Sequence, residues 1–307
     1  MKIELFIKKV LLYCGLDVRL VKKNQILSLE EIKEVNDNTL NYIKSLSENE
    51  LNRRVKSICC KDPLDQINTV DISNTLNKEG IVVIPEFLSE DEINKTRHTI
   101  SDVLLNVKIN DAKREDHEND DYIVQRKIIK GQSYFDLSNN PKPVVVIRQG
   151  NDQGMIDIFN VDRLLGKLGA EIHKVFIKNW LVKLFQDYKE PVNPKNLNLY
   201  INHSITKTRG FHVDSNYRSI KAFIYLTDVN TLEDGPYCYV KGTHVDTPFR
   251  KVNKLLGEKE APFTDHLDIT PIIGKKGTLI LADQSGIHRG IPQKQGSIRE
   301  VLVMRYR

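Results

Sequence analysis

Short runs of β-forming residues dominate the sequence beyond Leu197, and they constrain the fold more than any other feature. The runs cover residues 197–202, 211–213, 220–227, 237–240, 267–273, 277–282 and 298–306. Gly, Pro, Asp or Asn separates each run from the next. Short strands at regular spacing are typical of β-sandwiches and jelly rolls. We therefore expect this part of the chain to form a mainly β core.

The beginning of the chain has a helical pattern instead. Apolar residues recur at positions 3, 6, 7, 10, 11 and 14, which predicts an amphipathic helix from Met1 to about Leu16. Its apolar face, flanked by lysines, either lies on an anionic membrane surface or docks on the protein's own core or on a partner subunit. Residues 27–61 are also helical in pattern and open with a capping-box match at Ser28 and Glu31. We expect residues 1–69 to form an N-terminal helical extension.

The main domain is expected to span residues 70–307. It opens with EGIVVIPEFLSEDEI, in which residues 81–84 predict a short strand. Ser89 and Glu92 give a second capping-box match, for a helix that runs to about Leu105. The polar residues 110–119 predict an exposed loop. Beyond them, residues 144–150 predict a strand and residues 161–188 a helix.

Charge and composition narrow the classes of function. The 46 Lys and Arg residues against 41 Asp and Glu give a net charge of +5, without an arginine-rich arm or a zinc finger, so nucleic acid is not an expected partner. No window offers about 18 uninterrupted apolar residues, and the start lacks a signal-peptide profile. The four cysteines form no CxxC pair, as is usual for free thiols in a reducing compartment. We expect a cytoplasmic protein, with peripheral membrane contact only through its first helix.

The segment GFHVDSN places His212 and Asp214 two residues apart at the start of a β-rich run. Side chains two apart on a strand point to the same face, so an imidazole and a carboxylate can meet one ion there. The pattern alone is weak, because His244 and Asp246 repeat it.

His288 completes a possible set of metal ligands. It follows the apolar strand GTLILAD and precedes the last β-rich run. Two histidines and one carboxylate on one face of iron(II) form a facial triad that leaves three positions open. A co-substrate and dioxygen need such positions, whereas a closed tetrahedral zinc site offers none. We therefore expect His212, Asp214 and His288 to bind iron(II).

Arg299 follows His288 by eleven residues (299 − 288 = 11), at the start of a β-rich run that includes Ile298, Val301, Leu302 and Val303. A guanidinium that faces the inside of a barrel needs an anion, and a carboxylate can bind it through two parallel hydrogen bonds. The distal carboxylate of 2-oxoglutarate fits this requirement while its keto acid end chelates the metal. The alternative is a structural ion pair between Arg299 and Glu233 or Asp234.

Residues 79–307 resemble the phytanoyl-CoA dioxygenase family of iron(II)- and 2-oxoglutarate-dependent oxygenases. Four motifs match in order: EGIVVIPEFLSEDEI, GFHVDSN, EDGPYCYVKGTH, and GTLILADQSGIHRGI with its trailing Arg299. The resemblance implies a double-stranded β-helix core, a jelly roll of the cupin type, in which Arg299 pairs with a cofactor carboxylate. It also implies further cofactor contacts, for which the candidates are Asn198, Tyr200, Asn202, Thr227 and Ser297. His244, in the GTH motif, is expected to be structural.

The resemblance also bears on the reaction. Halogenating relatives lack the carboxylate that Asp214 provides, so its presence implies dioxygen-dependent hydroxylation of a C–H bond, or a related oxidation, with release of succinate and carbon dioxide. The expected substrate is a small molecule or a lipid-linked or glycan compound. The candidate substrate contacts are Arg148, Gln149, Tyr217 and Arg218.

Two other functions fit the same sequence. A non-catalytic binding module would keep the fold without turnover, although the intact triad argues against it. A zinc or manganese isomerase of the cupin type would act without dioxygen and would not need Arg299.

Overall fold

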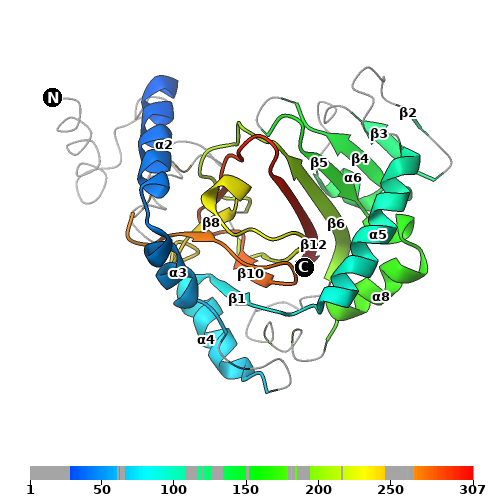
Figure 1. Ribbon diagram of the computed structural model, residues 1–307, viewed down its shortest axis with the longest axis horizontal. Helices are drawn as coiled ribbons and strands as arrows, with labels where there is room; N and C mark the ends of the chain where they lie inside the picture. The colour runs from blue at the N-terminus through cyan, green and yellow to red at the C-terminus, as the bar shows by residue number, and fades with distance from the viewer. Residues whose placement is uncertain are drawn as a thin grey trace.

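The computed structural model in Figure 1 describes only part of the chain. The described residues are 28–60, 62, 66–107, 117–118, 121–125, 134–149, 152–178, 181, 184, 194–215, 217–245, 261, 264 and 266–306. The amphipathic helix predicted for Met1 to Leu16 lies outside them. Among the described helices, none is both long enough and apolar enough to cross a membrane.

Two β-sheets form the centre of the described structure. The larger sheet has the order β1-β10-β7-β12-β6-β5-β4-β3-β2. Its strands are β1 (Ile81–Ile84), β10 (Leu279–Asp283), β7 (Ile220–Tyr225), β12 (Ile298–Tyr306), β6 (Pro194–His203), β5 (Ile156–Phe159), β4 (Val144–Ile147), β3 (Ile123–Gln125) and β2 (His117–Glu118). All of its neighbouring pairs are antiparallel except β3 with β4.

The smaller sheet has the order β11-β8-β9, with β11 at His288–Gly290, β8 at Tyr237–Val240 and β9 at Ile269–Ile272. A bridge between His212 and His288 adds the predicted 211–213 segment to its edge. After residue 194 the chain passes repeatedly between the two sheets: β6, β7, β10 and β12 belong to the larger sheet, and β8, β9 and β11 belong to the smaller one. This is the double-stranded β-helix that the sequence predicted, extended on one side by β5 to β2.

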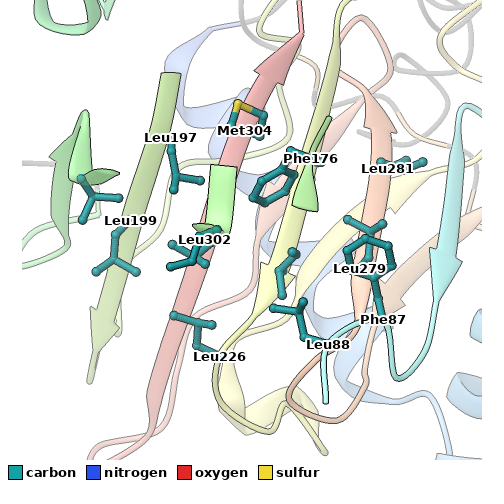
Figure 2. Packing of buried hydrophobic residues seen from close by; sticks show 14 of the residues in the cluster. Phe87, Leu88, Phe176, Leu197, Leu199, Leu226, Leu279, Leu281, Leu302 and Met304 are labelled. Carbon is teal, nitrogen blue, oxygen red and sulfur yellow. The ribbon is translucent and has the colours of Figure 1, made fainter. Parts of the chain in front are cut away.

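Alternating side chains divide the larger sheet into two packed faces. On the outer face, Leu279, Leu302 and Met304 belong to one apolar cluster with Phe87 and Phe176 (Figure 2). On the inner face, Phe223 and Val303 pack with Tyr239 of the smaller sheet. The period of two along each strand produces this division, because successive residues point to opposite faces. The inner face is where polar residues on the same strands can meet a site between the sheets.

Helices cover the larger sheet on its outer side and also flank the smaller sheet. The helices are α2 (Leu29–Lys44), α3 (Glu48–Lys56), α4 (Thr69–Glu79), α5 (Glu90–Val107), α6 (Tyr134–Asn139), α7 (Val161–Leu164) and α8 (Lys167–Val175). In Figure 1, α5 and α8 lie together on the side away from α2 and α3. Ile93 of α5 and Ile172 of α8 belong to the outer apolar cluster.

The described part of the N-terminal extension packs against the smaller sheet. Ile43 of α2 is fully buried in a cluster with Phe211 and Val240. Arg54 of α3 is only 5% exposed and donates hydrogen bonds to the carbonyl oxygens of His266 and Ile269. These helices therefore share a core with the barrel. The boundary between an extension at 1–69 and a domain at 70–307 stays a prediction.

Several local predictions are confirmed. The capping box at Ser28 and Glu31 is present at the start of α2. Ser89 and Glu92 exchange the two expected hydrogen bonds ahead of α5. Strand β1 has the predicted bounds.

Others are wrong or incomplete. The single helix predicted from residue 161 to 188 breaks after α7, because Gly166 has a φ of 55° that interrupts helical geometry before α8 begins. Residues 117 and 118 of the predicted loop form β2. Strands β3 and β5 were not predicted.

Candidate metal centre

The metal-binding motif lies at the edge of the smaller sheet. The backbones of His212 and His288 exchange two hydrogen bonds, N to O, of 3.0 and 2.9 Å. The Asp214 N–H donates to the carbonyl of Gln284 at 3.0 Å, which holds the motif along the segment that leads into β11. Two sections distant in the sequence are therefore joined through their main chains at the residues that carry the candidate ligands.

Each histidine ring is oriented by a carbonyl group two residues earlier. Nδ1 of His212 lies 2.8 Å from the oxygen of Gly210, and Nδ1 of His288 lies 2.9 Å from the oxygen of Gly286. A carbonyl oxygen only accepts hydrogen bonds, so in the neutral ring Nδ1 carries the proton and Nε2 offers a lone pair. Backbone carbonyls commonly fix the tautomer of metal-binding histidines in this way.

The three candidate side chains converge. Nε2 of His212 and Nε2 of His288 lie 3.6 and 3.8 Å from Asp214 Oδ1. One ligand atom from each residue lies within 4.8 Å of the others, and together they could hold a metal ion. His244, which repeats the motif, instead places Nε2 2.9 Å from the carbonyl oxygen of Asn77. It is outside this cluster, as expected.

The electrostatics of the cluster suit a cation. Burial and the neighbouring charge of His288 hold the pKa of His212 well below its ordinary value, so this ring stays neutral. Burial would raise the pKa of the Asp214 carboxyl, but the Lys221 ammonium and the two histidines outweigh it and hold that pKa well below its usual range. The site therefore presents a neutral imidazole and a carboxylate, the protonation states that bind metal.

Sequence reasoning missed two residues beside the triad. Lys221 Nζ donates to Asp214 Oδ2 at 2.6 Å. The Tyr237 ring lies 5.5 Å from the ring of His288 and 4.9 Å from that of Phe223. Lys221, Phe223 and Tyr225 are alternate residues of β7, so the period of two along the strand could have indicated that Lys221 faces inward with the two aromatic residues. For Tyr237, no sequence signal separated it from an ordinary core tyrosine.

Arg299 is buried on the inner face of β12, opposite Asn202 of β6. Its Nη1 donates to the carbonyl of Gly235, while its Nε has no hydrogen-bond partner. The proposed structural ion pair is not formed: Glu233 pairs with Lys294, and Asp234 Oδ2 accepts hydrogen bonds from the backbone N–H groups of Asn230 and Thr231. Burial lowers the pKa of Arg299, although not enough to neutralise a guanidinium. This side chain is therefore a buried cation that can take an anion.

The other predicted cofactor contacts divide into two groups. Asn202 has a buried Oδ1 without a partner, and Tyr200 lies on the same face of β6. Asn198, by contrast, uses its Oδ1 to accept a hydrogen bond from the backbone of Asn160. Thr227 Oγ1 accepts from the Glu300 N–H, and Ser297 is a half-buried turn residue. Only Tyr200 and Asn202 share the inner face with Arg299 and have no such structural bond.

Comparison with known families gives a match over most of the chain. The model of the phytanoyl-CoA dioxygenase (PhyH) family matches residues 76–301. The chain belongs to this family. As a phytanoyl-CoA dioxygenase family protein with a His-Asp-His cluster, it is an iron(II)- and 2-oxoglutarate-dependent enzyme of the oxygenase type.

Solved structures share the fold of this family member at low sequence identity. The α-ketoglutarate-dependent carbocyclase SnoK from nogalamycin biosynthesis is 15% identical, with a TM-score of 0.55 over 79% of this chain and 84% of SnoK. AviO1 from Streptomyces viridochromogenes Tue57 is 16% identical, with a TM-score of 0.52 over 78% of this chain and 95% of AviO1. HygX from Streptomyces hygroscopicus, solved with nickel and 2-oxoglutarate, is 13% identical, with a TM-score of 0.49 over 76% of this chain and 84% of HygX. A search of curated proteins gave no match.

The inner face of this phytanoyl-CoA dioxygenase family protein also fits 2-oxoglutarate. The buried Nε–H of Arg299 is a donor without a hydrogen-bond partner, and Asn202 lies directly opposite Arg299 on β6. Buried polar atoms are rarely left without a partner. A dicarboxylate between this pair and the metal ligands would give the guanidinium the anion that the described residues do not supply.

The candidate substrate residues do not form one cluster. Arg148 is held by Asp157 at 2.8 Å and Asp152 at 3.0 Å. Arg218 donates to the buried Asp283 at 2.9 Å and to Asn77.

The remaining two candidates, Gln149 and Tyr217, are exposed, Tyr217 by 83%. The two arginines thus have structural partners, and Tyr217 lies close in sequence to the metal motif.

Proposed function

We propose that His212, Asp214 and His288 bind iron(II) and that the enzyme hydroxylates a C–H bond of a small-molecule substrate. The observation that carries this proposal is the convergence of two Nε2 atoms and one carboxylate oxygen within 4.8 Å. Two histidines and one carboxylate on one face of iron leave positions for co-substrate and dioxygen. The backbone carbonyls that orient both rings support this assignment, because they aim Nε2 of each ring at the same space.

Arg299 is the proposed partner of the distal carboxylate of 2-oxoglutarate. Its burial and its unsatisfied Nε favour an anion there, and a carboxylate matches the planar guanidinium with two hydrogen bonds. Asn202 and Tyr200 are the proposed neighbours of the same ligand, on the strand opposite Arg299. Asn198, Thr227 and Ser297 are weaker candidates, since the structure shows each in another role.

Iron and 2-oxoglutarate, when bound, supply the oxidising chemistry by coupling decarboxylation of the co-substrate to dioxygen activation. The protein's own residues contribute position and exclusion of water. The aromatic ring of Tyr237 lies beside that of His288, and Phe223 packs against Tyr237, so one side of the site is apolar. An apolar surface of this kind excludes water and so protects a reactive centre from side reactions.

Hydroxylation is preferred to halogenation because Asp214 is present as a carboxylate beside both histidines. It takes the position that a halide would need. The proposed substrate is a small molecule, with Gln149 and Tyr217 as candidate contacts and Arg148 and Arg218 as less favoured ones. A lipid-linked or glycan substrate has no support from the described residues.

A succinate-release screen tests this function. The purified enzyme is given iron(II), 2-oxoglutarate, dioxygen and a panel of small molecules, and each product is analysed by mass spectrometry. We expect succinate release to increase with a substrate whose product gains one oxygen atom. Substrate conversion without dioxygen would instead indicate a zinc or manganese isomerase. Tight substrate binding without succinate release would indicate a non-catalytic binding module.

A further inference from the structure

Lys221 lies inside the barrel, on the strand that follows the metal motif. On β7, Ala222 and Ile224 belong to the outer apolar cluster, whereas Phe223 and Tyr225 belong to the inner one. Lys221 shares the inner face with Phe223, and only 14% of its side chain is exposed. A lysine in this position needs a partner, because a buried charge without one is costly.

The partner is the carboxylate of Asp214, whose two oxygens have different neighbours. Lys221 Nζ lies 2.6 Å from Oδ2. The other oxygen, Oδ1, lies 3.6 and 3.8 Å from the Nε2 atoms of His212 and His288. Only Oδ1 therefore faces the space between the two imidazole nitrogens.

The surroundings of Lys221 favour this arrangement. Arg305 lies directly opposite Lys221 on β12, and like charges in that position repel each other. The Tyr200 phenol and the buried Asp157 carboxyl also interact with the ammonium from the side of β6 and β5. The ion pair with Asp214 is thus one part of a polar group on the inner face, and it offsets the repulsion between Lys221 and Arg305.

We propose that Lys221 is a positioning residue that makes Asp214 a ligand through one oxygen only. By holding Oδ2, the ammonium prevents the carboxylate from turning to chelate the ion with both oxygens. The coordination position kept open in this way is one that 2-oxoglutarate or dioxygen requires. The inference rests on the proposed function, and it adds a residue outside the triad that determines how many positions the triad leaves free.

The test compares the wild-type protein with K221M, K221R and the control K95M. Lys95 forms an exposed ion pair with Glu171 at 3.3 Å between α5 and α8, away from the inner face. Each protein is titrated without oxygen, first with iron(II) and then with 2-oxoglutarate, while visible charge-transfer absorption is recorded. We expect K221M to shift the absorption maximum and to weaken 2-oxoglutarate binding at least tenfold. K95M should match the wild type, and K221R, which keeps a cationic donor, should recover most of the affinity.

A K221M protein with the wild-type absorption maximum and 2-oxoglutarate affinity would overturn the proposal. A second measurement uses the wild-type protein, so it does not require that a substituted protein folds. It is a crystal structure of the wild-type protein with cobalt(II) and 2-oxoglutarate. We expect Oδ1 as the only Asp214 ligand atom and Lys221 Nζ hydrogen-bonded to Oδ2; ligation by both oxygens, or a displaced lysine, would overturn the inference. Failure of the proposed function is distinguishable, because the wild type itself would then show no charge-transfer absorption.

Discussion

His212 and His288 are neighbours through their backbones as well as their rings. Their N–H and C=O groups form two mutual hydrogen bonds of 3.0 and 2.9 Å, and their ring centroids lie 4.5 Å apart. The spacing of the two candidate ligands is thus fixed by a β-bridge rather than by flexible side chains. Sites built on regular backbone pairing hold their ligands more closely than sites built on loops.

Arg299 should determine the requirement for 2-oxoglutarate. In R299M the co-substrate loses a charge-assisted contact worth about 1.5–3 kcal/mol, so its Kd should rise roughly 10- to 150-fold, while iron(II) still binds. Isothermal titration of the iron-loaded protein without oxygen measures this change. The matched control is R97M, since Arg97 lies on the opposite side of the sheet and pairs with Glu300, the next residue on β12. Equal 2-oxoglutarate affinity in R299M and R97M would count against the assignment.

The metal-free protein should lose stability in mild acid through His212. Its folded pKa lies well below the ordinary value of about 6.5, so the unfolded chain gains a proton first as the pH falls. The resulting loss of stability begins near pH 6.5 and continues down to the folded pKa, at up to about 1.4 kcal/mol per pH unit. H212Q removes this contribution. Urea unfolding in the presence of a chelator at pH 7 and pH 5 should therefore show a smaller decrease for H212Q; an unchanged decrease would contradict the prediction.

Arg54 should hold the N-terminal helices against the smaller sheet. Besides two backbone carbonyls, it donates to the Tyr42 hydroxyl at 2.8 Å and pairs with Glu50 at 2.7 Å. Removing it in R54M leaves several buried acceptors unpaired and should lower the free energy of unfolding by about 2–4 kcal/mol. R53M is the matched control: Arg53 pairs with the same Glu50 but is 70% exposed, and its loss should cost less than about 1 kcal/mol. Denaturant titration compares the two, and equal losses would show that α3 does not depend on Arg54.

Much of the barrel could be predicted from the sequence because its strands are apolar and separated by turn residues. The final strand, at 298–306, has the predicted bounds, and Arg299 lies near its start. Strand β5 was missed because Asp157 interrupts its short apolar run. The carboxylate of Asp157 pairs with Arg148, which directly follows the neighbouring strand β4, and the apolar pattern of residues 156–159 does not reveal this ion pair.

The triad was also predictable in its members but not in its environment. His212 and Asp214 follow strand spacing, and the family motifs select His288. Lys221 binds one oxygen of Asp214 because β7 packs beside the metal motif. The apolar periodicity of the sequence does not specify this packing. The helix predicted over 161–188 failed for a different reason, since one glycine with a positive φ separates α7 from α8.

The central claim is that His212, Asp214 and His288 assemble an iron(II) site that binds 2-oxoglutarate. Its most direct test is the anaerobic addition of iron(II) and 2-oxoglutarate to the wild-type protein and to D214A, followed by visible spectroscopy and, after admission of oxygen, by succinate measurement. We expect the wild type to develop a charge-transfer absorption that saturates at one iron per chain, and D214A to lose both the absorption and succinate release. A D214A protein that releases succinate at the wild-type rate would contradict the claim.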